Sequence, residues 1–118
     1  MAYGCIVNMA TKNMSDDVIQ LDQLLELDKV IHERVRLGIM SALSASKKLT
    51  FNDIKQVLKA TDGNLGMHLR MLEKHEYIEV EKKFVGRKPQ TSYQISEKGQ
   101  KAFRHYICII EKLVSELK

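Results

Sequence analysis

The stretch from residue 51 to residue 95 most constrains the fold, because the spacing of its apolar residues changes halfway along it. Its first half contains two short runs with helical spacing, separated by a break at residues 59–63. Its second half alternates between apolar and polar residues over 77–84 and 91–95, on either side of VGRKPQ, which holds the only proline. This pattern predicts two short helices joined by a tight turn and followed by a β-hairpin with a long, basic tip.

Both short helices have start signals in the sequence. Thr50 precedes the first, and Asp53 stands where a partial capping box requires an acid. Thr61 or Asp62 can cap the second, which we expect to end near His75. Apolar residues of the second helix recur at i, i+4 and i+7 and predict one buried line: Leu65, Leu69 and Leu72.

Three further helices are expected around this stretch. The first begins at Ser15, where two acids suit a helix N-terminus. Asp28 can cap a second, whose apolar stripe ends in the small polar residues after Leu43, and Ser96 can cap the last. The predicted fold is therefore mainly α with a small β-hairpin.

Length and composition fit one domain. The chain has 118 residues, of which 44% are hydrophobic, enough for a single core. Residues 1–14 show no periodicity and are expected to form a flexible N-terminal tail, with residues 15–118 as the domain. No apolar run approaches the ~18 residues needed to cross a bilayer, and the opening segment lacks the basic lead of a secretory signal. We therefore expect a cytoplasmic protein with no membrane partner, and Cys5 and Cys108 as reduced thiols.

Charge is distributed unevenly along the chain. Residues 15–28 hold five acids and no base, whereas residues 82–98 hold five bases and one acid. A basic segment of this size can form a local surface that attracts phosphates.

The order helix, turn, helix, basic hairpin is that of a winged helix-turn-helix, which places its second helix in the major groove of DNA. An α-helix turns about 100° per residue, which identifies the residues opposite the predicted buried line. This opposite face of the second helix has no acid before Glu73. The expected DNA-binding residues on it are Thr61, Asn64, Gly66, Met67, Arg70 and Lys74. Arg70 suits guanine or phosphate, and Asn64 suits adenine or phosphate.

The hairpin supplies a second set of expected contacts. Arg87 and Lys88 lie at its tip, from which they can reach the adjacent minor groove or the phosphate backbone. Thr91 follows on the returning strand. A solvated basic turn is the alternative reading of this tip.

Residues 27–106 closely resemble the winged-helix transcriptional regulators of the ArsR/MarR-like superfamily, and most of all the small stand-alone winged-helix DNA-binding domain proteins. The most specific segments are HERVRLGIM, TDGNLGMHLRMLEKHEYIE and GRKPQTSYQISEKG. The resemblance implies major-groove positions for Asn64, Gly66, Met67 and Arg70. It also implies that Arg87 lies at the wing tip and that Thr91 and Tyr93 lie on the returning strand.

Two positions depart from the family pattern. Glu76 stands where relatives often have glycine after the recognition helix, so the turn there lacks the conformational freedom of glycine. Gly66 stands where many have serine or threonine, so this chain offers a phosphate no hydroxyl there. The glycine could instead let the DNA approach the helix closely.

The last helix, about residues 96–118, is too apolar for a helix that only covers a small core. We expect part of it to form a two-fold interface with the first helix, giving a homodimer that binds a palindromic operator. The expected interface residues are Leu21, Leu24, Leu25, Phe103, Tyr106, Ile110, Leu113 and Leu117.

The expected function is thus a sequence-specific transcriptional regulator, a homodimeric repressor more readily than an activator. A winged-helix protein-interaction module is one alternative, and a regulator that senses a metal or small molecule is another. His105 and Cys108 lie one turn apart on the last helix, but no zinc-site spacing is present, so we expect no metal and no cofactor. No catalytic motif is present either, so we expect no enzymatic activity.

Overall fold

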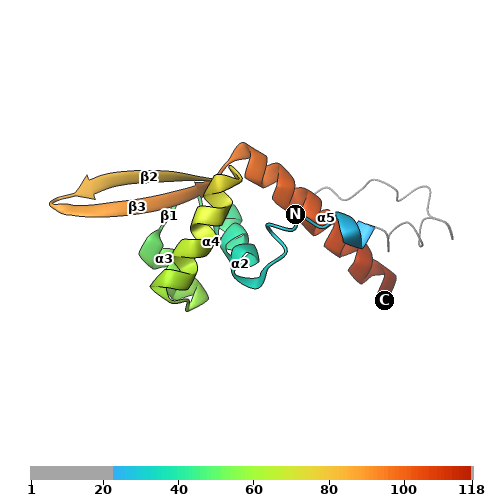
Figure 1. Cartoon of the computed structure of the whole chain (residues 1–118). Coiled ribbons are helices and arrows are strands. Elements are labelled where there is room, and N and C mark those ends of the chain that lie inside the picture. Colours follow the sequence, from blue (N-terminus) through green and yellow to red (C-terminus); the bar gives the residue numbers. More distant parts are fainter. Residues whose placement is uncertain (1–22, 118) are drawn as a thin grey trace.

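The computed structural model describes residues 23–117, in which a long β-hairpin projects from a cluster of helices (Figure 1). In chain order the elements are η2 (Gln23–Glu26), α2 (Arg34–Ala45), β1 (Leu49–Thr50), α3 (Phe51–Leu58), α4 (Asp62–Lys74), β2 (Ile78–Val85), β3 (Lys88–Ile95) and α5 (Glu97–Leu117). This confirms the predicted mainly α class with a β-hairpin. The tail expected at residues 1–14 and most of the helix expected from Ser15 lie outside the described residues.

The sheet is antiparallel, with strand order β1-β3-β2. β2 and β3 pair from Ile78 and Ile95 to Val85 and Lys88. The prediction of a long hairpin tip is wrong, because only Gly86 and Arg87 connect the strands. Gly86 has a φ of +67°, which allows a two-residue turn of the kind that matches the strand twist.

Pro89 lies inside β3, although proline was expected to mark the loop. It pairs with Phe84 of β2, and on the other side of β3 the short β1 pairs only as far as Ser92. Pro89 therefore lies where β3 has a free edge, and there the missing N–H removes no bond of the sheet.

The start expected for the second helix is also wrong. α2 begins at Arg34, where the Glu33 side chain accepts a hydrogen bond from the Arg36 N–H at 2.8 Å. Asp28 instead accepts hydrogen bonds from the N–H groups of Val30 and Ile31, which makes a local turn. The second Asp28 oxygen accepts from the Tyr77 hydroxyl, so this turn is tied to the start of the hairpin.

The helix-turn-helix forms as its capping residues predict. Thr50 and Asp53 form a complete capping box, with reciprocal bonds of 3.0 and 3.1 Å. α3 ends at Leu58, and Lys59 adopts a left-handed conformation with φ of +54°. The Thr61 hydroxyl oxygen accepts from the Asn64 N–H at 3.2 Å and caps α4.

The core lies where α2, α3, α4 and α5 meet the sheet. Its buried apolar side chains are Leu27, Ile31, Ile39, Met40, Leu43, Ile54, Leu65, Leu69, Leu72, Ile78, Tyr93, Phe103, Tyr106 and Ile109. The predicted buried line of α4 is thus confirmed.

On α5, Cys108 is disulfide-bonded, which contradicts the expected reduced thiol. The other cysteine, Cys5, lies outside the described residues.

α4 ends in a Schellman motif that turns the chain into the hairpin. The Tyr77 N–H donates to the Leu72 carbonyl at 3.0 Å, and the Glu76 N–H donates to the Glu73 carbonyl at 2.9 Å. Glu76 has a φ of +65°, in the left-handed region that the motif requires. A glutamate therefore occupies a position where glycine would be unstrained.

The hairpin returns next to this turn, and α5 starts there. The Ser96 hydroxyl donates to the Glu76 carbonyl and accepts from the Gly99 N–H, so it caps α5 as expected. A Cβ at Gly99 would lie 2.0 Å from the Tyr77 carbonyl oxygen, so only glycine allows this approach. From this junction α5 runs away from the hairpin to the opposite end of the molecule (Figure 1).

We predict that Glu76→Gly stabilises the protein. The left-handed conformation costs a residue with a Cβ roughly 1 kcal/mol or more, part of which is offset by the greater freedom of glycine in the unfolded chain. The ion pair lost with Glu76, to Lys98 at 3.7 Å, is exposed and contributes little. Urea unfolding should therefore give a free energy of unfolding higher by about 0.5 kcal/mol or more.

Glu73→Gly is the matched control, because Glu73 is an exposed glutamate in the last turn of the same helix. It should destabilise by roughly 1 kcal/mol, the usual cost of glycine within a helix. Equal destabilisation by both variants would show that Glu76 is not strained.

Candidate nucleic-acid interface

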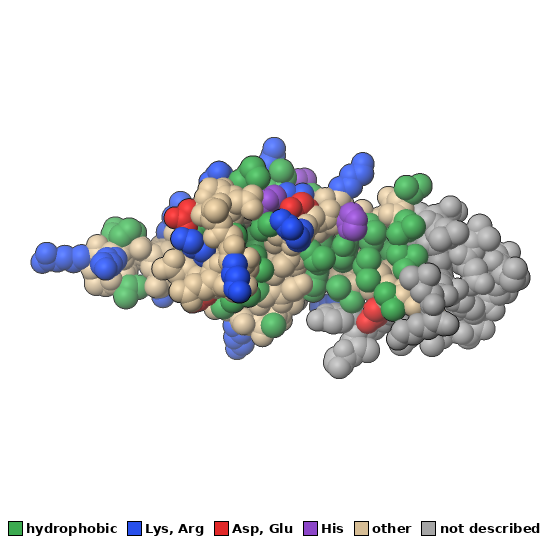
Figure 2. All heavy atoms as spheres, turned by 90° about the horizontal axis from the view of Figure 1, so that it is seen from below, with side chains coloured by type: hydrophobic (Ala, Val, Ile, Leu, Met, Phe, Trp, Pro, Cys, Tyr) green, Lys and Arg blue, Asp and Glu red, His purple; other side chains and the backbone are tan. Residues whose placement is uncertain are grey.

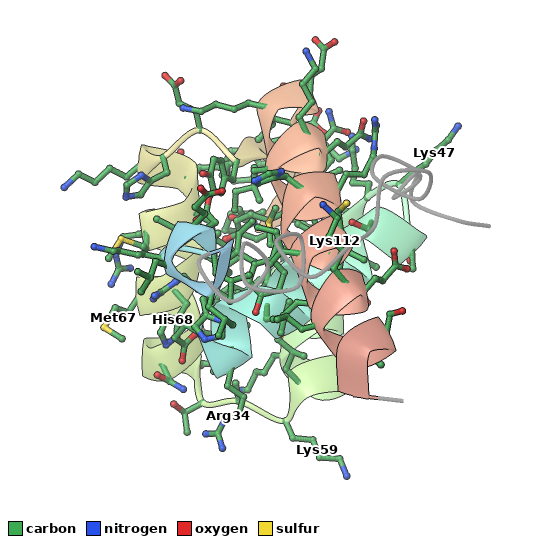
Figure 3. The ribbon with its side chains drawn as sticks, turned by 90° about the vertical axis from the view of Figure 1, so that its right-hand side faces the viewer. Arg34, Lys47, Lys59, Met67, His68 and Lys112 are labelled. Atoms are coloured by element: carbon green, nitrogen blue, oxygen red, sulfur yellow. The ribbon has the colours of Figure 1, made fainter. Side chains whose placement is uncertain are left out.

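The outward face of α4 is set by what the helix buries. Leu65, Leu69 and Leu72 enter the core, so the residues about half a turn away from them point to solvent. Figure 3 shows Met67 pointing away from the molecule and His68, the next residue, pointing between α4 and its neighbours. Met67 is 50% exposed, and His68 is buried.

The exposed face carries the side chains that the sequence predicted for it. Asn64, Arg70 and Lys74 are all exposed, as are Met67 and Met71. Thr61 is exposed at the start of the same helix, but its hydroxyl oxygen already serves as the cap. Toward a ligand the hydroxyl therefore offers its O–H donor and one remaining acceptor site.

Gly66 leaves space for Arg70 on the next turn. A Cβ added at Gly66 would meet the Arg70 Nη1 atom at 3.4 Å, and a Cβ at Gly63 would meet no atom within 4 Å. The guanidinium therefore lies back along the helix over Gly66. Both positions would allow an alanine, so neither glycine is required by packing within the chain.

A polar network under α4 fixes the helix to α2. An Arg36 Nη atom donates to His68 Nδ1 at 2.9 Å, and Glu33 Oε1 lies 3.6 Å from the same nitrogen. Arg36 Nε also donates to the Val30 carbonyl. Partial burial acts to raise the pKa of Glu33, but the hydrogen bond from the Arg36 N–H and the nearby Arg36 charge outweigh it and lower that pKa.

A second polar contact holds the base of the hairpin. The Tyr77 hydroxyl donates to Asp28, and burial, this hydrogen bond and the Asp28 charge together raise the pKa of Tyr77 to about 12. The Lys98 ammonium lies 5.7 Å from the centre of the Tyr77 ring. The start of β2 is thus tied to the loop before α2 and to α5.

The hairpin is a basic arm beyond the body of the molecule. Every residue from 81 to 89 is exposed, including Arg87 and Lys88. Figure 2 shows basic side chains at the outermost end of this arm. Thr91 lies further back on β3 and is half-buried, and Tyr93 is buried in the core.

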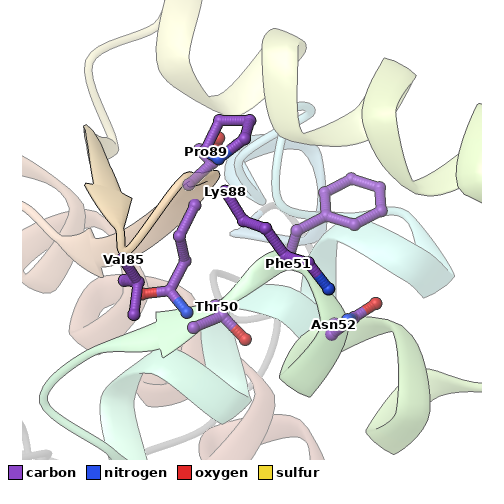
Figure 4. Close-up of a pocket in the computed structure, with 8 residues that line it drawn as sticks. Thr50, Phe51, Asn52, Val85, Lys88 and Pro89 are labelled. Carbon is purple, nitrogen blue, oxygen red and sulfur yellow. The ribbon is translucent and has the colours of Figure 1, made fainter.

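A groove joins the hairpin to the start of α3 (Figure 4). It has a volume of about 450 Å³ and is lined by Thr50, Phe51, Asn52, Val85, Lys88, Pro89, Gln90 and Thr91. Sequence reasoning missed Asn52 and Gln90 as neighbours of Lys88. The pairing of β1 with β3 brings α3 to the hairpin, but β1 is only two residues long. Such a short strand has no periodic signal.

The residues expected at a dimer interface fall into two groups. Phe103 and Tyr106 are buried in the chain's own core, where the Tyr106 hydroxyl lies 2.7 Å from His32 Nδ1. Ile110 and Leu113 are only partly buried against the core, and Leu24 and Leu25 are exposed. Leu21 lies outside the described residues, and Leu117 is the last residue of α5.

Residues 23–117 provide neither a cluster of metal ligands nor a membrane-spanning helix. No three His, Cys, Asp or Glu side chains come together there as a set of metal ligands. In the same part of the chain, no helix combines the length and the hydropathy needed to cross a membrane.

Relatives of known structure have the same arrangement. A transcriptional regulator homologue from Pyrococcus horikoshii is 27% identical and superimposes with a TM-score of 0.76, over 85% of this chain and 98% of that one. The transcriptional repressor BigR from Xylella fastidiosa is 17% identical, with a TM-score of 0.58 over 90% of this chain and 98% of that one, which shows the shared fold. An uncharacterised protein of Methanocaldococcus jannaschii is 33% identical over 90 residues, 76% of this chain and 98% of that protein.

The family model described as a winged helix DNA-binding domain matches residues 35–114. This range contains α3, α4 and the hairpin, and therefore the whole exposed surface described above. The chain belongs to the winged helix DNA-binding domain family and is a transcriptional regulator of that type, in a family of regulators and not of enzymes.

Proposed function

We propose that this protein is a cytoplasmic, sequence-specific repressor that binds a palindromic operator as a homodimer. The observation that carries the proposal is the outward face of α4, which presents Asn64, Arg70 and Lys74 to solvent and has a basic arm beside it. An α-helix fits the major groove, and an adjacent hairpin can then reach the neighbouring minor groove or backbone.

In the proposed complex the two parts of the surface have different tasks. Arg70 can donate two hydrogen bonds to guanine, and Asn64 can pair with adenine, so α4 would select the sequence. Lys74, Arg87 and Lys88 would bind phosphates and supply affinity that falls with salt. Thr61 and Thr91 would contact the backbone at the two ends of this surface, and Met67 would contact a thymine methyl group.

Exposed apolar side chains near α5 support a dimer. Leu25 is 86% exposed and Leu24 is 43% exposed on η2, and Val114 is exposed on α5. Together with Ile110 and Leu113 they would form a two-fold interface, whereas Phe103 and Tyr106 would support it from the core. Two copies of α4 would then lie about one DNA turn apart, roughly 34 Å.

A protein-interaction module is the second candidate. It is favoured by the exposure of Met67 and Met71 on the same face of α4, because methionine is common on surfaces that bind varied partners. The bases around these methionines favour DNA instead, since a nucleic acid supplies the matching negative charge.

The first test replaces the arginine of α4. Arg70→Ala should weaken binding to a selected operator by about 1–3 kcal/mol and broaden the set of sequences bound. Fluorescence anisotropy with duplexes selected from a random pool by the full chain measures both effects. Arg104→Ala, an exposed arginine on α5, is the matched control and should bind as the unmodified protein does.

If Arg70→Ala and Arg104→Ala bind these duplexes with equal affinity and equal sequence preference, α4 is not the reading helix. Failure of the unmodified chain to enrich any duplex would contradict the proposal as a whole.

The second test concerns the role of Gly66. Because a Cβ fits within the chain at both Gly63 and Gly66, alanine at either position should raise the stability of α4 by up to roughly 1 kcal/mol. If DNA approaches α4 closely, only Gly66→Ala should weaken operator binding, by tenfold or so (about 1.4 kcal/mol). Thermal melting and anisotropy on the two variants separate stability from binding, and equal affinities would show that no close approach occurs at Gly66.

The third test concerns the dimer. Leu25→Glu places a charge in the proposed interface and should raise the dimer dissociation constant by roughly thirtyfold, the effect of losing about 2 kcal/mol. Val57→Glu changes another exposed apolar residue, on α3 and outside the proposed interface, so it should leave the oligomeric state unchanged. Sedimentation velocity over a concentration series measures both, and a monomeric unmodified chain would contradict the proposed interface.

A further inference from the structure

The end of the hairpin exposes two large apolar side chains that no part of the described structure covers. Phe84 is 72% exposed and Val85 is 54% exposed, in the middle of a run of nine exposed residues, 81–89. From residue 81 to the turn the arm extends roughly 13 Å, at about 3.3 Å per residue. These side chains therefore contribute nothing to the core and are held out from the body of the molecule.

The pairing of the strands places Phe84 beside a second apolar residue. Phe84 is directly opposite Pro89, so the two side chains lie on the same face of the hairpin. Side chains along β2 alternate between the two faces of the sheet, so Ile78, Val80 and Phe84 lie on the same face. Ile78 and Val80 pack against the helices. The Phe84 and Pro89 pair thus continues the helix-bearing face of the sheet, the side on which α4 lies, and Val85 points the other way.

The residues nearest this pair in the hairpin are basic, and Glu81, the nearest acid along β2, is paired with Lys48 at 2.6 Å. Residues 82–90 contain Lys82, Lys83, Arg87 and Lys88 and no acid. Figure 2 shows hydrophobic atoms and basic side chains next to one another at the end of the arm. Apolar groups ringed by cations match a partner whose apolar parts lie between two rows of anions, as base pairs lie between the phosphates of a DNA groove.

We propose that Phe84, supported by Pro89, is an apolar wedge that enters the minor groove of the bound DNA and partly unstacks one base-pair step. This proposal rests on the DNA-binding function proposed above and deepens it. The surrounding lysines and Arg87 hold the phosphates on both sides, so that the ring is directed at the stacked bases.

The wedge has consequences for specificity. Opening a step costs least at the flexible pyrimidine–purine steps TA and CA/TG, so the protein prefers such a step at the position the hairpin reaches. Minor-groove wedges also bend the duplex toward the major groove, in which α4 would lie. The hairpin then selects sequence through deformability, without hydrogen bonds to base edges.

The test uses the full chain and duplexes that it enriches from a random pool, with 2-aminopurine in place of adenine at the expected flexible step. The unmodified protein should raise the 2-aminopurine fluorescence, because that base loses its stacking partner. Phe84→Gln should abolish the rise and lower affinity by roughly tenfold, as expected for loss of one aromatic stacking contact. Since Phe84 is exposed, the variant should melt at the same temperature as the unmodified protein.

Two further variants identify the cause of the effect. Phe84→Leu keeps an apolar wedge and should retain most of the affinity and of the fluorescence rise. Val85→Gln is the matched control on the opposite face of the same strand and should change neither. Arg87→Ala should reduce the slope of affinity against salt by about one and leave the fluorescence rise in place.

Some results would overturn the wedge alone. If Phe84→Gln keeps the fluorescence rise and the affinity, while Arg70→Ala weakens binding, the protein binds DNA without a wedge. If Phe84→Gln leaves DNA binding unchanged and instead abolishes binding to vesicles of phosphatidylglycerol, the exposed pair is a lipid contact. If the unmodified chain enriches no duplex, the proposed function fails and the wedge fails with it.

Discussion

The burial of one side of α4 is the constraint on which the candidate surface depends. Leu65, Leu69 and Leu72 are almost wholly buried, and each contributes roughly 1.5–3 kcal/mol to stability. The polar contact of His68 with Arg36, at 2.9 Å, adds about 1 kcal/mol by comparison. The leucines therefore fix the rotation of the helix about its axis, and the polar network adds directionality. No outward residue of α4 can change its direction without exposing this line.

The turn after α4 transfers this constraint to the hairpin. Its Schellman bonds, the Ser96 hydroxyl and the close approach of Gly99 to Tyr77 join the end of α4, both strands and the start of α5 within a few residues. The left-handed Glu76 is the one strained position in that junction. The direction in which the arm leaves the body is therefore set at its base, and the exposed residues 81–89 are free to contact a partner.

Sequence reasoning predicted the parts of the fold that local chemistry determines. The capping box at Thr50, the buried line of α4 and the alternation in the hairpin all depend on neighbours in the chain, and all were found. The length of the hairpin tip was missed although it is local, because Gly86 allows a turn of two residues. Two other errors occurred where distant contacts decide. Asp28 was expected to cap a helix, but its side chain binds its own turn and Tyr77, a residue far along the chain. The groove beside Asn52 depends on a strand too short to leave a pattern.

The composition of the α4 face limits how much sequence it can read directly. Only Asn64 and Arg70 have side chains suited to paired hydrogen bonds with a base, each good for about 1–3 kcal/mol of discrimination. Specific regulators discriminate by roughly 4–10 kcal/mol against other DNA. One copy of α4 would therefore supply only part of this discrimination. A second copy related by two-fold symmetry would double the contribution of α4. A hairpin that responds to the deformability of the DNA would add selectivity without any hydrogen-bonding side chain. This role would explain why the arm exposes Phe84 at a position where a polar residue would be better solvated.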